Sequence, residues 1–130
     1  MNLIIIALAP VFVIAVYIYI RDKYEREPIR LLLISLVVGC VITIPVVVIE
    51  KLLSVRGQDF TGLASAAWNA FVVAACTEEL FKFMALYLLI WRNRHFNEKF
   101  DGIVYASFIS LGFAGVENIL YVTEGGLSVG

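Results

Sequence analysis

The stretch that decides the fold is Cys76-Thr77-Glu78-Glu79-Leu80-Phe81-Lys82, which sits inside an apolar run from about Ala64 to Trp91. Apart from Glu78, Glu79 and Lys82, that run contains no charged residue. An ionised side chain near the centre of a membrane helix costs roughly 2.5–3.5 kcal/mol, so such residues are candidates for function. A further acid, Glu117, lies in the next apolar run. The two runs therefore predict membrane helices that share a buried polar site.

Composition supports a membrane protein. Of the 130 residues, 62% are hydrophobic and 16% are charged, whereas an average soluble domain is about 45–50% apolar. A membrane-spanning helix needs about 20 mostly apolar residues, and four runs qualify, at about 2–20, 29–53, 64–91 and 103–123. We therefore predict an all-α polytopic membrane protein in which residues 1–130 form one helical domain with four transmembrane helices. The net charge of −1 and the lack of a basic block argue against a nucleic-acid partner.

Charge in the connections predicts the orientation. The first run is predicted to be an uncleaved helix, because a signal peptide begins with positive charge and here Arg21, at the end of the run, is the first charge. Basic residues then number four in 21–30, two in 51–63, three in 92–102 and none after Glu124. The positive-inside rule places 21–30 and 92–102 in the cytoplasm. The N-terminus is then outside.

Local signals predict where the helices begin and bend. Pro28 suits the first turn of the second helix, Pro45 predicts a kink in it, and Asp101-Gly102 predicts a turn that starts the fourth. The two cysteines, Cys40 and Cys76, lie in apolar runs and are interpreted as small packing residues.

Two stripes of residues spaced by four predict how the last two helices pack. Small residues at this spacing let membrane helices approach closely. Both stripes run into polar groups, so we expect the third and fourth helices to pack face to face around a small polar site. The stripes are Ala66, Ala70, Ala74, Glu78 and Lys82 on the third helix, and Ala106, Ser110, Ala114 and Asn118 on the fourth.

The charges at this site leave three functions open. Lys82 follows Glu78 by four residues and Glu79 by three, spacings that allow ion pairs on a helix. One lysine neutralises one carboxylate, but the site has three carboxylates when Glu117 is included. The cluster is therefore a structural salt bridge in a membrane scaffold, a hydrolase site whose carboxylate takes a proton from water with or without a metal, or a transporter site that carries protons or cations. Spacing alone does not decide among them.

Longer stretches of the chain resemble the PrsW family of bacterial intramembrane proteases. The resemblance is carried by the first connection and by three segments around the charged residues: Asp22-Lys23-Tyr24-Glu25-Arg26-Glu27-Pro28, Glu78-Glu79-Leu80-Phe81-Lys82, Phe96-Asn97-Glu98-Lys99-Phe100-Asp101-Gly102-Ile103-Val104-Tyr105, and Ser110-Leu111-Gly112-Phe113-Ala114-Gly115-Val116-Glu117-Asn118-Ile119-Leu120-Tyr121.

The resemblance implies a multi-pass protease of the bacterial cell membrane. Its partners would be the lipid bilayer and a membrane-anchored anti-sigma factor, which it cuts first on the outer side of the membrane in a stress-response cascade. By analogy with the more distant CAAX-processing proteases, the double-glutamate motif supplies the water-activating carboxylate. We expect Glu78 to be the base and Lys82 to hold Glu79, although the assignment between the two acids stays open.

The motif Phe113-x-x-x-Glu117 supplies, by the same resemblance, a second residue of the site. Asn118 is interpreted either as a group that orients Glu117 or donates to an oxyanion, or as a link between helices. A divalent metal such as zinc is the candidate cofactor of the complete protein, with Glu78, Glu79 and Glu117 as candidate ligands.

The chain departs from the family at its end. Family members continue with further helices that bear histidine motifs, whereas this sequence stops at Gly130. Zinc sites usually include His or Cys. We therefore expect these residues to be the N-terminal part of a larger fold that, alone, inserts in the membrane without cleaving a substrate or binding zinc tightly.

The topology predicts which side of the membrane can be labelled. A cysteine placed at Asn97, in an otherwise cysteine-free chain, should react with a membrane-impermeant thiol reagent only after the cytoplasmic side is opened. A cysteine in the connection 54–63 should react from outside in intact cells. If the reagent labelled the cysteine at position 97 in intact cells, the predicted orientation would be wrong.

Overall fold

Helices account for every regular element in the part of the chain that the structure describes. This computed structural model describes residues 2–22 and 26–127, with side chains for 3–22 and 26–125, so Lys23, Tyr24 and Glu25 of the first connection lie outside the description. The prediction of an all-α fold is confirmed. The elements are α1 (Asn2–Arg21), α2 (Ile29–Arg56), the 3₁₀ turn η1 (Gly57–Asp59), α3 (Gly62–Ala67), the π-helix η2 (Trp68–Cys76), α4 (Thr77–Ile90) and α5 (Lys99–Leu127).

Three helices in the described residues are long and apolar enough to cross a membrane. They are the segments Leu3–Arg21, Ile29–Asp59 and Lys99–Gly125. The remaining predicted span, about 64–91, is helical from Gly62 to Ile90 but is divided among α3, η2 and α4, which have 6, 9 and 14 residues. The structure thus gives three candidate spans, and the fourth stays a prediction.

The π-helix changes the face that the third predicted helix presents. A π-helix closes hydrogen bonds from i to i+5, and the Oγ1 of Thr77 likewise donates to the carbonyl oxygen of Val72, five residues back, at 3.2 Å. Side chains four residues apart then no longer stay in line. Ala66 and Ala70 are in fact exposed. Ala74 is half-buried, so the predicted stripe is wrong as a packing surface at Ala66 and Ala70, because the prediction assumed α-helical geometry throughout.

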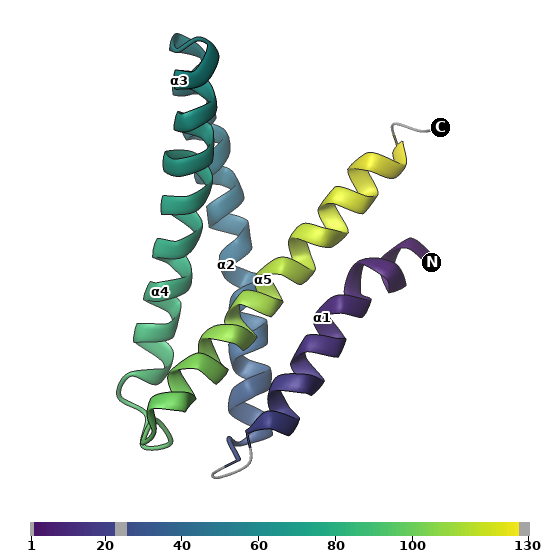
Figure 1. Ribbon diagram of the computed structural model, residues 1–130, viewed down its shortest axis with the longest axis vertical. Helices are drawn as coiled ribbons and strands as arrows, with labels where there is room; N and C mark the ends of the chain where they lie inside the picture. Colours follow the sequence, from purple (N-terminus) through teal and green to yellow (C-terminus); the bar gives the residue numbers. More distant parts are fainter. Residues whose placement is uncertain (1, 23–25, 128–130) are drawn as a thin grey trace.

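Close backbone contacts at two glycines, Gly39 and Gly112, join α2 to α5, and the two helices cross in Figure 1. A Cβ atom on Gly39 would lie 2.0 Å from the carbonyl oxygen of Ile109, and one on Gly112 would lie 2.0 Å from that of Leu36. Only glycine permits this backbone approach. The Sγ of Cys40 donates to the carbonyl oxygen of Gly112 at 3.3 Å beside the crossing. α5 packs most extensively on α2, then on α1, and less on α4, so the predicted pairing of the third and fourth helices is present but is not the main contact of α5.

The start of α5 is held by buried acids from two segments. The Oδ2 of Asp101 accepts hydrogen bonds from the backbone N–H groups of Asn97 (3.0 Å) and Glu98 (2.7 Å), which caps the helix. The hydroxyl of Tyr105 donates to the carboxyl of Glu27, whose own N–H donates to Asp22 at 3.0 Å. These contacts tie the first connection to α5.

Two local predictions need correction. Asp101 and Gly102 lie inside the first turn of α5, which begins at Lys99; the aspartate acts as a cap and no turn separates it from the helix. Cys76 is exposed and is not a packing residue, whereas Cys40 is half-buried at the crossing. Pro45 lies within the uninterrupted α2, and Pro28 directly precedes that helix.

Glycine-to-alanine substitutions should show whether the helix crossing is more sensitive to an added methyl group than an ordinary packing contact is. Gly39→Ala or Gly112→Ala should lower the free energy of unfolding in detergent by about 1–3 kcal/mol, because a methyl group forces the two backbones apart. Gly115→Ala is the matched control, since its Cβ would lie 3.5 Å from the Cδ2 of Leu8, an ordinary contact. Equal effects at all three positions would contradict the proposed role of the crossing.

Glu27 should make stability depend on pH. Burial, and then the negative charges of Asp101 and Asp22, raise its pKa from 4.5 to about 6 despite the Tyr105 hydrogen bond, which lowers it. The folded state therefore holds this proton more tightly than the unfolded state, so the contribution of Glu27 to stability is fully present below pH 4.5 and is lost as the pH rises through about 6. Glu27→Gln, which keeps an acceptor for Tyr105, should flatten the melting temperature across this window. An unchanged pH slope in the variant would contradict the assignment.

Candidate intramembrane carboxylate site

The first turn of α4 carries the double-glutamate motif, directly after the π-helix η2. Lys82 lies one turn further on, and its Nζ donates to Glu78 Oε2 at 3.0 Å and to Glu79 Oε1 at 3.1 Å. One cation thus serves both acids. The side chains of Lys82 and Glu78 are 16% and 22% exposed, whereas that of Glu79 is 74% exposed. Glu78 is therefore the shielded acid of the motif, and Glu79 faces outward.

Phe113 brings α5 to this motif. The ring is buried at 1% exposure, and the Lys82 Nζ lies 4.5 Å from the ring centroid, which is a cation–π contact. Glu117 follows Phe113 by one helical turn, so both residues share one face of α5. The aromatic residue of the motif therefore positions the lysine, and that contact links α4 to the helix that carries Glu117.

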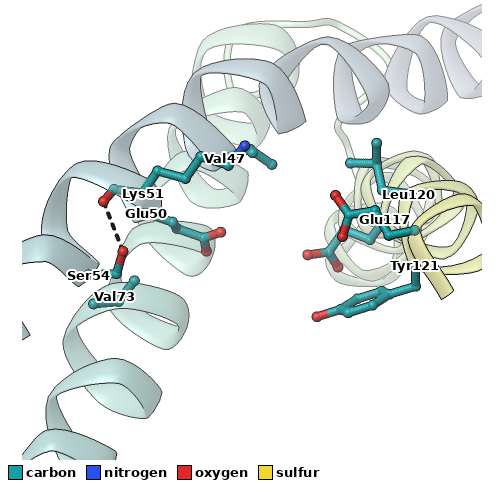
Figure 2. Close-up of a pocket in the computed structure, with 9 residues that line it drawn as sticks. Val47, Glu50, Lys51, Ser54, Val73, Glu117, Leu120 and Tyr121 are labelled. Atoms are coloured by element: carbon teal, nitrogen blue, oxygen red, sulfur yellow. Dashed lines mark hydrogen bonds between the residues drawn. The ribbon is translucent and has the colours of Figure 1, made fainter. Parts of the chain in front are cut away.

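Glu117 opens onto a cavity of about 370 Å³ between α2 and α5. In Figure 2 the carboxyl groups of Glu50, on α2, and Glu117, on α5, point toward one another across the cavity. The charge of Glu117 interacts with those of Glu78 and Lys82, and the charge of Glu50 interacts with all three. The structure therefore brings Glu78, Lys82 and Glu117 together and adds Glu50.

Sequence reasoning missed Glu50. The predicted second span, about 29–53, already contains it, next to Lys51. An acid inside a candidate membrane span is itself the signal that could have found it. In the structure its Oε1 is buried and has no hydrogen-bond partner among the described residues.

Asn118 faces a different helix from its neighbour Glu117. Its Nδ2 donates to the carbonyl oxygen of Ala7, on α1, at 3.0 Å. This bond corresponds to the interhelical alternative for Asn118. A role in orienting Glu117 or an oxyanion stays a prediction.

The site carries an excess of negative charge. The two salt bridges among the described residues both belong to Lys82, so neither Glu50 nor Glu117 has a lysine or arginine in direct contact within that set. No group of three or more His, Cys, Asp or Glu side chains among the described residues has the arrangement to hold a metal ion. The residues present do not, by themselves, form a metal site.

The helical fold and its three apolar candidate spans indicate an all-helical membrane protein that carries a candidate carboxylate site. The model of the PrsW family, described as intramembrane metalloproteases, matches residues 27–129. The chain belongs to this family, and its resemblance to PrsW proteases is confirmed.

Individual relatives agree with the family assignment. The chain is 36% identical over 126 residues to Protease PrsW of Geobacillus kaustophilus, which covers 97% of the chain and 54% of that protein. It is 34% identical over 123 residues to Protease PrsW of Bacillus subtilis (92% and 53%) and 37% identical over 120 residues to that of Oceanobacillus iheyensis (92% and 54%). The chain thus spans about half the length of these curated relatives. No solved structure matches it.

Proposed function

We propose that this chain carries part of the active site of an intramembrane protease of the bacterial cell membrane, and that its substrate is a membrane-anchored anti-sigma factor. The observation that supports the proposal most is the convergence of Glu78 and Glu117, from the two motifs of the family, on one site beside Lys82. In this role the protein makes the first cut of a stress-response cascade.

The chemistry assigned to this chain's residues is hydrolysis of a peptide bond. Glu78 takes a proton from water, and the resulting hydroxide oxygen adds to the scissile carbonyl carbon. The proton then passes to the leaving amine as the C–N bond breaks. Glu78 is assigned as the base because it is the shielded acid of the motif, with its Oε2 held at 3.0 Å from the Nζ of Lys82. Glu79, which the same lysine holds, faces outward and is assigned a supporting role.

Topology fits a cut on the outer side of the membrane. We propose four spans with the N-terminus outside, the helical run from Gly62 to Ile90 being the third. With the connections 21–30 and 92–102 in the cytoplasm, α2 and α5 both run outward. The cavity is lined by the C-terminal halves of these helices and by Val73 of η2. Those helix halves form the outer side of α2 and α5 in this orientation.

The rest of the site is proposed to come from a larger fold. Because the chain spans about half of its relatives, we propose that residues 1–130 are the N-terminal part of such a fold. No metal can be assigned to the carboxylates of the part of the chain that the structure describes. An activity test therefore joins the chain to the remaining half of the Geobacillus kaustophilus relative, with the 130 residues alone as the comparison that is expected to insert without cleaving.

Substitution of the two acids should separate protease from scaffold. In the joined protein, Glu78→Gln or Glu117→Gln should reduce cleavage of a membrane-anchored reporter by about 100-fold or more, the scale of general-base catalysis, with unchanged protein in the membrane. Glu79→Gln is the matched control and should lose less, because its side chain faces outward. Variants that only lose stability would support a structural salt bridge. Proton or cation flux through reconstituted protein without cleavage would support a transporter.

A further inference from the structure

An apolar groove of about 200 Å³ lies between α1 and α2. Phe12, Val16 and Tyr19 line it from α1, at spacings of three to four residues that place them on one face of the helix. Leu33 lines it from α2, and the buried Phe108 of α5 lies at its base. From Phe12 to Tyr19 the groove follows α1 for about 10 Å, which is about two-thirds of the hydrocarbon layer of one leaflet, about 15 Å.

The groove remains open because the helices on its two sides are joined through a third. Within the described residues α1 packs on α5, as α2 does, but α1 and α2 have hardly any direct contact with each other. The side chains of Phe12 and Leu33 are 70% and 56% exposed. The groove is therefore accessible from the lipid side of the bundle.

A guanidinium lies at one end of the groove. The Cζ of Arg26 is 6.0 Å from the centroid of the Tyr19 ring, at the limit of a cation–π contact. The Arg26 side chain is exposed, and it makes no salt bridge to an acid among the described residues. Its charge is therefore available to an anion that reaches the groove.

Charges at this end of the bundle are sorted by burial. The end of α1 and the start of α2 lie at the same end of the bundle in Figure 1, and Arg21, Arg26 and Arg30 in this region are all exposed. The acids Asp22 and Glu27 are instead buried, and both accept hydrogen bonds within the protein. The exposed charge beside the groove is therefore positive among the described residues.

An apolar groove that ends at an exposed cation complements the two parts of an anionic phospholipid. An acyl chain fills the groove, and the phosphate meets the fork of N–H donors of the guanidinium. Basic pockets between transmembrane helices on the cytoplasmic side bind anionic headgroups in this way. A free phosphate ion has no chain for the groove, and an apolar helix packed there would leave Arg26 without an anion.

We propose that the groove between α1 and α2 binds one acyl chain of an anionic phospholipid, and that the phosphate of this lipid lies against Arg26. The groove shares no lining residue with the cavity at Glu117, so the lipid site is separate from the carboxylate site. In the proposed orientation it lies in the cytoplasmic leaflet. The inference does not rest on the proposed protease function.

A tryptophan in the groove reports which lipid occupies it. Phe12→Trp is made in a chain whose Trp68 and Trp91 are replaced by phenylalanine. The protein is reconstituted in phosphatidylcholine vesicles that contain a small share of phosphatidylglycerol or phosphatidylcholine brominated on the acyl chains, since bromine quenches nearby tryptophan fluorescence. Brominated phosphatidylglycerol should associate about fivefold more strongly, the scale of one arginine beside anionic lipid. Val13→Trp, at an exposed position outside the groove, is the matched control and should show less than twofold preference.

Variants of Arg26 identify the group responsible. Arg26→Gln should reduce the preference at position 12 to less than twofold, while quenching by brominated phosphatidylcholine stays the same. Arg26→Lys, which keeps the charge, should retain a preference above twofold. Arg94→Gln is the matched control, because Arg94 is an exposed cation in the other connection that is predicted to be cytoplasmic, and it should leave the preference unchanged.

Four results would overturn the inference. These are equal association of the two lipids at position 12, an equal preference at positions 12 and 13, an intact preference in Arg26→Gln, and a loss of quenching by both lipids in that variant, which would show a structural role.

The chain joined to the remaining half of the Geobacillus kaustophilus relative, with the tryptophans of that half also replaced, should keep the preference. Its loss there would show that the other half covers the groove, and would also overturn the inference. None of these measurements requires cleavage, so their outcomes are independent of the proposed hydrolysis.

Discussion

The backbone contact at Gly39 and Gly112 is the constraint on which the arrangement of the helices depends. Each glycine presents its Cα to a carbonyl oxygen of the other helix, so a single methyl group on either would meet backbone. Without a hydrophobic force between helices in lipid, such close packing is what drives association. The crossing fixes the position of Glu117, five residues beyond Gly112, relative to Glu50 on the other helix. The cavity between these acids is therefore a consequence of the crossing.

The second constraint is that one lysine serves a cluster of acids. Lys82 bonds Glu78 and Glu79 and lies over the ring of Phe113, so all of its strong interactions are taken within α4 and at one point of α5. Removing charges from water is costly, and attraction repays that cost only where the geometry is good. The ion pair with Lys82 offsets this cost for Glu78. No cation among the described residues offsets it for Glu50 or Glu117, and both acids face the cavity.

Local sequence patterns were sufficient to find the charged residues of the candidate site but not the helix packing that brings them together. Glu78, Lys82 and Glu117 stood out because charge within an apolar run is rare, and the all-α class followed from the long apolar runs. The π-helix of Trp68–Cys76 has no signal in residue spacing, and the alanine stripe was therefore wrong in part. The dominance of α2 over α4 as the partner of α5 depends on two glycines far apart in sequence. Glu50 was missed although the predicted span 29–53 contains it, because the acid lies beside Lys51 near the end of that span and its neighbours across the cavity come from a helix far away in sequence.

Two acids of α5, one in its first turn and one in its interior, show why acids in this protein divide into structural and functional groups. Asp101 lies where a helix begins, and backbone N–H groups that the helix cannot use donate to its carboxylate. Glu117 lies about 24 Å further along, 16 residues at about 1.5 Å each, where the N–H groups of the helix interior are already bonded. An acid at that depth can be satisfied only by another side chain, by water or by a bound molecule. The same reasoning applies to Glu50 within α2, since the interior of a helix offers its carboxylate no backbone donor. A carboxylate in mid-helix and without a cation can therefore accept hydrogen bonds from water or from a bound molecule.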